Sequence, residues 1–227
     1  MIISNVQCQP SIKTKAVLNY LVKEPKVKSD IPPVVFLLHG IGSNEKDLFS
    51  LADYLPANFL VISVRAPYSL GGDGYAWYHA DFSTPKPVFN KEEAEKSRNT
   101  IIQFISELKT QYPFDERQIY LLGFSQGAIM SYSVGLTKPD LVKGIAIMSG
   151  RLLENVKPLI VANDQLKQLN IFISHGTNDP VLNLQDARDA VAYLKTLKLN
   201  PTYKEYIAGH AINEEMLTDV KNWLGKK

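Results

Sequence analysis

The sequence predicts an α/β fold built on a doubly wound, mostly parallel central sheet with helices on both faces. Short continuous apolar runs alternate with segments of helical period along most of the chain, and polar residues directly follow several of the apolar runs. A continuous apolar run of strand length is typical of a strand buried on both faces of a parallel sheet. With 227 residues, no internal repeat and no low-complexity segment, the chain is expected to form a single domain, residues 1–227.

The amino-terminal half begins with an alternating segment, residues 15–23, that predicts a strand at the edge of the sheet. The apolar runs at residues 32–38 and 58–64 predict strands buried on both faces. Between them, residues 44–55 have the spacing of a helix that is capped by asparagine and followed by proline. Residues 91–111 form the clearest predicted helix, with acidic residues at its start and one apolar face.

The carboxyl-terminal half continues this alternation. The predicted elements are a strand at 115–123, a helix at 128–136, a strand at 142–148, a weakly patterned connection at 155–167, a strand at 169–174, a helix at 184–197, a strand at 202–207 and a final helix that includes 216–224. Ligands of an open α/β sheet bind at the carboxyl ends of its strands. The polar residues that follow these strands are therefore expected at one edge of the sheet.

Residues 66–90 form the longest stretch without a predicted element. This stretch is rich in aromatic residues: Tyr68, Tyr75, Trp77, Tyr78, Phe82 and Phe89. A long loop in a compact domain is usually functional or disordered, and the aromatic content argues against disorder, so we expect it to form one wall of a pocket. An Ω-like surface loop packed on its own aromatic side chains is the alternative. His79 and Asp81 also lie here, but two potential metal ligands without a third are weak evidence for a metal.

Composition restricts the partners that the protein can have. The 25 basic residues nearly balance the 23 acidic ones, so neither a nucleic-acid partner nor an acidic tail is expected. Cys8 is the single cysteine, which excludes an internal disulfide and favours a reducing compartment. No signal peptide and no apolar run of membrane-spanning length is recognisable, so the sequence predicts a cytoplasmic protein without a membrane span. A homodimer is left open.

The segment Gly123-Phe124-Ser125-Gln126-Gly127 joins a predicted buried strand to a predicted helix. A serine at such a corner is typical of a nucleophile elbow, in which a strained turn points the hydroxyl outward. Glycines two residues to either side have a steric reason, because the tight turn brings neighbouring backbone close. The alternative is a glycine-flanked serine that caps a helix.

A serine hydroxyl needs a base, and the base needs an acid that fixes its tautomer. The chain supplies Ser125, Asp179 and His210 in the order found with nucleophile elbows, and each follows a predicted strand. Asp179 is preferred as the acid over Asp164, Asp186 and Asp189, which lie in polar segments or on the expected exposed face of a helix; the alternative for Asp179 is a turn aspartate before a proline. His175 is expected to brace the turn that follows it.

Attack on a carbonyl produces an oxyanion, which requires hydrogen-bond donors already in place. In an elbow, one donor is the backbone N–H of the residue after the serine, here Gln126. We expect the second donor in the loop His39-Gly40-Ile41-Gly42 and choose the N–H of Ile41, with Gly42 as the alternative. A tight strand-to-helix turn without this role is the other interpretation of the loop.

Four segments carry a resemblance: Leu-Leu-His-Gly-Ile-Gly from Leu37, Gly-Phe-Ser-Gln-Gly from Gly123, His-Gly-Thr-Asn-Asp-Pro-Val from His175 and Gly-His-Ala-Ile from Gly209. Together they resemble the phospholipase/carboxylesterase family of α/β-hydrolases, which includes small bacterial carboxylesterases and acyl-protein thioesterases. The resemblance runs from about Val34 to the carboxyl terminus. It implies an α/β-hydrolase fold, a triad of Ser125, Asp179 and His210, no cofactor, and short- to medium-chain acyl esters or thioesters as substrates. Ala128, where eukaryotic thioesterases usually carry glycine, and Ser43-Asn44-Glu45, in place of a more acidic segment, favour a general esterase.

The leading hypothesis is therefore a serine carboxylesterase that hydrolyses small acyl esters without a cofactor or a metal. Loop position indicates the residues of its apolar substrate pocket: Trp77, Tyr78, Leu152, Val181 and Ile212. A lysophospholipase or acyl-protein thioesterase would share the triad and differ in acyl length. A non-catalytic binding protein of the same fold and a metal-dependent hydrolase are the remaining alternatives, although the histidines show no metal-ligand spacing.

Overall fold

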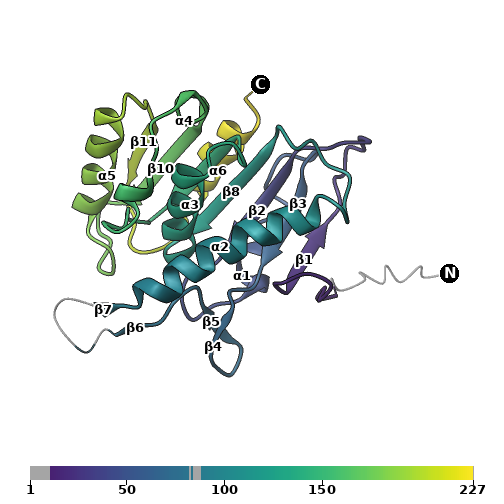
Figure 1. Cartoon of the computed structure of the whole chain (residues 1–227), viewed down its shortest axis with the longest axis horizontal. Helices are drawn as coiled ribbons and strands as arrows, with labels where there is room; N and C mark the ends of the chain where they lie inside the picture. The colour runs from purple at the N-terminus through teal and green to yellow at the C-terminus, as the bar shows by residue number, and fades with distance from the viewer. Residues whose placement is uncertain (1–10, 82, 84–87, 227) are drawn as a thin grey trace.

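A computed structural model describes residues 11–81, 83 and 88–226 (Figure 1). Two residues discussed above, Cys8 and Phe82, lie outside the described residues. A seven-stranded sheet runs through the molecule in the order β1-β3-β2-β8-β9-β10-β11. Its strands are β1 (Tyr20–Lys23), β2 (Val34–Leu38), β3 (Leu60–Val64), β8 (Ile119–Phe124), β9 (Gly144–Met148), β10 (Asn170–Gly176) and β11 (Thr202–Tyr206).

The sheet is mostly parallel, as predicted. Strand β1 pairs antiparallel with β3 at one edge, and the other neighbouring strands pair in parallel. The carboxyl ends of β2, β8, β9 and β10 consequently lie along the same edge of the sheet, where an α/β fold places its ligands.

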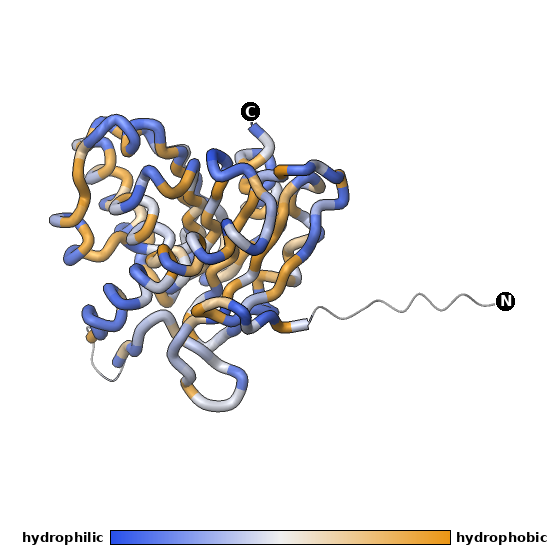
Figure 2. The backbone as a smooth tube through the Cα atoms, turned by 45° about the vertical axis from the view of Figure 1, so that its right-hand side comes forward, coloured by the Kyte–Doolittle hydropathy of each residue, from blue (hydrophilic) through white to orange (hydrophobic). Residues whose placement is uncertain are grey.

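Helices cover both faces of the sheet, which confirms the predicted fold class. Strand β2 shows why: Phe36 and Leu38 belong to one apolar cluster, whereas Val35 and Leu37 belong to another, because successive side chains of a strand point to opposite faces. The first cluster includes buried residues of α2 (Lys91–Leu108), α3 (Gln126–Thr137), α4 (Asp164–Gln168) and α5 (Leu184–Thr196). The second includes residues of α1 (Glu45–Phe49) and α6 (Glu214–Leu224). Figure 2 shows the apolar strands inside and hydrophilic turns outside.

The stretch predicted to lack regular elements instead contains two short hairpins. Strands β4 (Tyr68–Gly71) and β5 (Gly74–Ala76) pair antiparallel, as do β6 (Ala80–Asp81) and β7 (Val88–Phe89). Gly71 and Gly72 adopt positive φ angles of 91° and 56° at the first turn, a conformation that glycine reaches without a steric penalty. These strands are too short to give an alternating sequence pattern, so the prediction of an irregular loop was wrong.

Several other predicted boundaries also differ. The edge strand expected over residues 15–23 begins only at Tyr20, as β1, and the helix expected over residues 91–111 ends at Leu108, as α2. The helix expected over residues 44–55 ends at Phe49 as α1, and the N–H groups of Leu51 and Ala52 bond to carbonyls three residues back rather than four. The weakly patterned connection at 155–167 contains a 3₁₀ turn, η1 (Lys157–Leu159), and the start of α4. Among the described residues, no helix has both the length and the apolar character needed to cross a membrane.

Candidate active site

Ser125 lies at a strained corner between β8 and α3. Its φ and ψ angles are 53° and −118°, outside the regions that L-residues commonly adopt. Its N–H donates to the carbonyl of Met148 on β9, and its own carbonyl accepts from the N–H of Ile129, so both flanking elements hold the corner in place. This is the strand-turn-helix geometry that the sequence predicts.

The two glycines around Ser125 are required by close backbone contacts. A Cβ atom on Gly123 would lie 2.3 Å from the carbonyl oxygen of Gly127. A Cβ atom on Gly127 would lie 1.8 Å from the carbonyl oxygen of Leu38 at the end of β2. Both distances are far below a van der Waals contact, so the corner packs against β2 only with glycine at these positions.

The hydroxyl of Ser125 does not cap its helix. In the described chain, α1, α2, α4, α5 and α6 each follow an asparagine whose side chain accepts a backbone N–H of the first turn. Ser125 precedes α3 and makes no such bond. The capping alternative for Ser125 is therefore wrong, because this side chain is turned toward another partner.

That partner is His210, which lies between β11 and α6. Its Nε2 is 2.9 Å from Ser125 Oγ, and its Nδ1 is 2.7 Å from Asp179 Oδ2. The structure thus brings together three side chains that are 85 and 31 residues apart in sequence. Phe124 packs against the imidazole with the ring centroids 4.9 Å apart.

The side chain of Asp179 is buried and accepts several hydrogen bonds. Its Oδ1 accepts from the N–H groups of Val181 and Leu182, at 2.8 and 2.9 Å. Burial raises the pKa of Asp179, but the bonds from His210, Leu182 and Val181 together outweigh it and leave the pKa below its ordinary value. The carboxylate is therefore ionised at neutral pH and available to a cationic imidazole.

His175 is a second histidine beside the same carboxylate, and it is completely buried. Its Nε2 lies 2.9 Å from the carbonyl oxygen of Leu182 and 3.3 Å from Asp179 Oδ2. The carbonyl can only accept, so Nε2 carries a proton and donates it. His175 therefore braces the turn at residues 179–182, somewhat further along than the turn at 176–178 that the sequence suggested.

Two of the three competing aspartates have other partners, and the third, Asp186, lines the cavity described below. Asp164 pairs with Lys167, and Asp189 accepts from the side chain of Gln185. In the described structure, none of the three is hydrogen-bonded to His210.

The loop after β2 lies against the same corner. Gly42 donates its N–H to the carbonyl of Tyr75 at 2.8 Å, and Tyr75 donates its own N–H to the carbonyl of Ser43. In contrast, no described residue accepts from the N–H of Ile41. The N–H of Gln126 also has no intrahelical acceptor, because it is the first residue of α3.

The side chain of Gln126 has a role that the sequence did not reveal. Its Oε1 accepts from the backbone N–H of Trp77, and its Nε2 donates to the backbone carbonyl of Tyr78, both at 2.7 Å. A side-chain amide can pair with a donor and an acceptor at once, so Gln126 fixes the β5–β6 connection to the corner. No local sequence signal identifies these partners, which are 49 and 48 residues away.

His39 forms the other support of this loop. Its Nε2 accepts from the N–H of Ala66 at 3.0 Å, so Nδ1 carries the proton and donates to the carbonyl of Gly40 at 2.7 Å. Burial lowers the pKa of His39 more than its hydrogen bond and nearby carboxylates raise it. The imidazole is therefore neutral, and its backbone carbonyl accepts from Trp77 Nε1 at 2.9 Å.

A buried ion pair lies behind the same loop. Arg65 donates to both carboxylate oxygens of Glu45, at 2.5 and 2.6 Å, and to the hydroxyl of Tyr75 at 3.2 Å. Because the backbone of Tyr75 holds Gly42 and Ser43, this pair supports the loop through β5.

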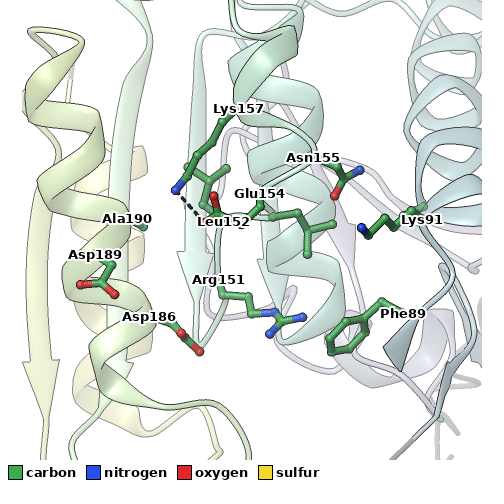
Figure 3. A pocket seen from close by; sticks show the side chains of 12 residues that line it. Phe89, Lys91, Arg151, Leu152, Glu154, Asn155, Lys157, Asp186, Asp189 and Ala190 are labelled. Carbon is green, nitrogen blue, oxygen red and sulfur yellow. Dashed lines mark hydrogen bonds and ion pairs between the residues drawn. The ribbon is translucent and has the colours of Figure 1, made fainter. Parts of the chain in front are cut away.

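The predicted pocket residues lie in different surroundings. Trp77 and Tyr78 expose 0% and 1% of their surface, so both rings are packed in the core behind the site. Val181 is 57% exposed, and its N–H is the one bound to Asp179. Leu152 lines a cavity of about 390 Å³, shown in Figure 3, whereas Ile212 lines another hollow with Leu51 and Tyr54.

The two residues considered as weak metal ligands have protein partners instead. His79 Nδ1 is 2.8 Å from a carboxylate oxygen of Glu93, and Asp81 accepts from the N–H of Ser83. Within residues 11–81, 83 and 88–226, no three His, Cys, Asp or Glu side chains are grouped so that they could hold a metal ion.

Comparison with known proteins places this geometry in a family. Residues 20–227 match the Phospholipase/Carboxylesterase family. The chain is 36% identical over 212 residues to acyl-protein thioesterase 1 of Mycosarcoma maydis, covering 84% of this chain and 88% of that protein. The carboxylesterase of Bacillus cereus has a similar structure, with a TM-score of 0.80, 25% identity, and coverage of 92% of this chain and 94% of that one. A carboxylesterase from Mesorhizobium loti shares the fold, with a TM-score of 0.82, 21% identity, and coverage of 96% and 99%. The chain is accordingly a serine hydrolase that belongs to the phospholipase/carboxylesterase family.

Proposed function

We propose that the protein is a carboxylesterase that hydrolyses short- to medium-chain acyl esters through an acyl-enzyme on Ser125. The observation that carries this proposal is the continuous pair of hydrogen bonds from Ser125 Oγ to His210 Nε2 and from His210 Nδ1 to Asp179 Oδ2. These distances fit the proton transfers of a Ser-His-Asp triad without rearrangement.

In this reaction, Ser125 Oγ attacks the ester carbonyl while its proton passes to His210 Nε2. The resulting imidazolium is stabilised by the ionised Asp179. Collapse of the tetrahedral intermediate breaks the bond to the alcohol, which leaves with the proton from His210. A water molecule, deprotonated by His210, then attacks the acyl-enzyme and releases the carboxylic acid and free Ser125.

The backbone N–H groups of Ile41 and Gln126 are the proposed oxyanion donors. The engagement of the Gly42 N–H by Tyr75 supports Ile41 over its neighbour, because a donor already bound in the ground state is not available to the oxyanion. Gln126 supports the site twice, through its backbone N–H and through the side chain that fixes residues 77 and 78.

A thioesterase or lysophospholipase with the same catalytic residues is the second candidate. The thioesterase name of the Mycosarcoma maydis relative favours it. A series of p-nitrophenyl esters of increasing acyl length separates the candidates, since each additional methylene contributes binding only where an apolar pocket receives it. A kcat/KM maximum beyond about ten carbons would favour the second candidate, and a maximum at shorter acyl groups would favour the first.

The decisive test compares Ser125→Ala with Ser133→Ala. Ser133 is a buried serine of the same helix whose hydroxyl bonds to the carbonyl of Ile129, so it is a matched control. Ser125→Ala should reduce hydrolysis of p-nitrophenyl butyrate by at least about 10⁴-fold and abolish labelling by a fluorophosphonate. Ser133→Ala should retain both. Undiminished turnover by Ser125→Ala would refute the proposal, and a wild-type protein that is neither active nor labelled would favour a non-catalytic binding role.

A further inference from the structure

A cavity of about 390 Å³ lies beside the carboxyl end of β9, and no residue of the proposed triad lines it. Its walls come from the loop after β9, from the start of α2 with the adjoining β7, and from α5 (Figure 3). Leu152, Ala94 and Ala190 supply apolar surface. This volume lies within the range of small-molecule sites.

Arg151 reaches across this cavity toward Phe89, as Figure 3 shows. The central carbon of its guanidinium lies 4.0 Å from the centroid of the Phe89 ring. Stacking on an aromatic ring holds the planar guanidinium in one orientation and leaves its edge open for a planar anion.

The Nε of Arg151 is buried, and no described residue accepts a hydrogen bond from it. Burial of a charged group costs free energy when one of its donors loses water and gains no acceptor. Such unpaired buried donors are uncommon in folded proteins. An anion that occupies the cavity would supply the missing acceptor, because carboxylates commonly pair with guanidinium through two parallel hydrogen bonds.

Lys91, at the start of α2, also lines the cavity and has no ion-pair partner among the described residues, but it is exposed. An exposed lysine contributes little to an ion pair, so the buried Nε of Arg151 is the stronger candidate for the anion. Lys157 pairs with Glu154 at 2.7 Å, and this is the one interaction marked among the side chains drawn in Figure 3. Asp186 and Asp189 project from α5 on the opposite side from Phe89, and Asp189 already accepts from Gln185. Their negative charges would disfavour a phosphate dianion more than a carboxylate, so the cavity is better suited to a single negative charge.

The cavity is close enough to Ser125 to receive part of the same substrate. Gly150 packs so tightly on Ala128 that a Cβ atom on the glycine would lie 2.6 Å from the alanine Cβ. Ala128 lies in the first turn of α3, about 4.5 Å along the helix axis from Ser125. Because Arg151 follows Gly150 directly, its backbone lies on the order of 10 Å from Ser125.

We propose that this cavity binds a carboxylate of the substrate through Arg151, so that the preferred substrates are esters that carry a second, acidic group away from the scissile carbonyl. This inference rests on the proposed esterase function and specifies its substrate class. The acidic group can belong to the acyl part or to the alcohol part, and the experiment distinguishes the two.

The test measures a ratio of kcat/KM values for matched esters. In the acyl arm, p-nitrophenyl monoesters of glutaric, adipic and suberic acid are compared with the corresponding terminal carboxamides. In the alcohol arm, butyrate esters of ω-hydroxy acids are compared with those of the ω-hydroxy amides. Each pair differs by one charge at nearly constant shape, and spontaneous hydrolysis is subtracted. Wild-type protein should prefer the carboxylate by about 10- to 100-fold in one arm.

Three variants assign the preference. Arg151→Met removes the charge but keeps an apolar stem, and it should bring the ratio close to one. Arg151→Lys retains the charge without the planar fork and should keep an intermediate ratio. Lys167→Met is the control, since this exposed cation pairs with Asp164 and does not line the cavity, and it should retain the wild-type ratio. Because each ratio comes from one protein sample, a reduced folded fraction does not affect it.

Binding to Ser125→Ala protein gives a second readout that does not require turnover. Calorimetry should show the carboxylate ester binding at least about tenfold more tightly than its carboxamide twin, with the difference lost when Arg151→Met is added. Wild-type hydrolysis of the carboxamide esters with ratios near one in both arms would overturn the inference and leave the esterase function intact. Tighter carboxylate binding without any hydrolysis would support the cavity and overturn the esterase function. The inference would also be overturned if Arg151→Met retained the wild-type ratio and the wild-type difference in binding, as the control Lys167→Met should.

Discussion

The buried polar groups that follow β2 have hydrogen-bond partners, whereas, in the described chain, several at the ends of β9 and β10 have none. After β2, both ring nitrogens of His39 have partners, and Glu45 and Arg65 bind each other. At the ends of β9 and β10, three buried polar atoms have no hydrogen-bond partner among the described residues: Ser149 Oγ and Arg151 Nε after β9, and His175 Nδ1 near the end of β10.

The two arginines make this difference concrete. Both stack on an aromatic ring, Arg65 on Tyr75 at 4.6 Å and Arg151 on Phe89 at 4.0 Å. Each guanidinium nitrogen of Arg65 donates to Glu45 or Tyr75, whereas Arg151 has a buried donor without an acceptor. A fully paired buried network stabilises one conformation, and an unpaired buried charge is stabilised by a ligand.

The comparison indicates that the two regions have different roles around Ser125. The loop after β2 holds the N–H of Ile41, one of the two proposed oxyanion donors, in a fixed position, and such a donor is effective only when no reorganisation accompanies the reaction. The ends of β9 and β10 carry Asp179, the acid of the proposed triad, and the open cavity. In the proposed reaction Asp179 gains its charged partner when His210 becomes an imidazolium, and Arg151 gains an acceptor when a ligand binds.

The largest expected effect is at Asp179. Asp179→Asn keeps the shape of the side chain but presents an amide to His210 Nδ1, which favours the wrong imidazole tautomer, so kcat/KM should fall by about 10⁴-fold at pH 7. The measurement is steady-state hydrolysis of p-nitrophenyl butyrate. Asp164→Asn, at an exposed carboxylate that pairs with Lys167, serves as the control. Because the pKa of Asp179 lies below its ordinary value, this carboxylate should remain ionised between pH 7 and 5 and should not cause an acid loss of activity there. A drop of less than tenfold would show that Asp179 does not orient the base.

The next effect concerns the ion pair at the β2 edge. Glu45→Gln leaves Arg65 largely buried without a counter-charge and should lower the free energy of unfolding by about 3 kcal/mol. Urea denaturation measures this change. Glu116→Gln, which breaks an exposed pair with Lys109, should lower it by less than about 1 kcal/mol.

The same variant has a pH dependence with a defined sign. Burial raises the pKa of Glu45, but the hydrogen bonds from Arg65 and further favourable interactions lower it below the ordinary value of 4.5. A group whose pKa is lowered on folding contributes its stability above the ordinary pKa and loses it as the pH falls through the folded value. The stability difference between wild type and Glu45→Gln should therefore be full above pH 4.5 and shrink in more acidic solution. A difference that grows on acidification would contradict this assignment.

The smallest expected effect is at His175. His175→Leu removes the donor that holds the carbonyl of Leu182 and loosens the turn around Asp179, so kcat should fall by about tenfold with little change in KM. His175→Gln offers a side-chain N–H near the position of Nε2 and should recover part of the loss. The exposed His79 provides a control through His79→Gln. Equal losses in the leucine and glutamine variants would mean that packing, rather than the hydrogen bond, is what His175 contributes.

The sequence by itself determined the sheet, the strained corner and the order of Ser125, Asp179 and His210. Each of these depends on local information: apolar runs identify buried strands, and the glycines around Ser125 identify a turn that tolerates no Cβ atoms. The parallel sheet then necessarily brings the residues after its strands to one edge.

Tertiary structure alone decided which groups are engaged and which are open. The burial of Trp77 and Tyr78, the occupation of the Gly42 N–H by Tyr75 and the unpaired Nε of Arg151 all depend on contacts between segments that lie far apart in the chain. Sequence periodicity indicates which face of an element is apolar, but it carries no information about which distant polar group meets which. Hydrogen-bond partners are fixed by the packing of whole elements, so the residues of the proposed triad could be predicted from the sequence while the surroundings of the proposed substrate could not.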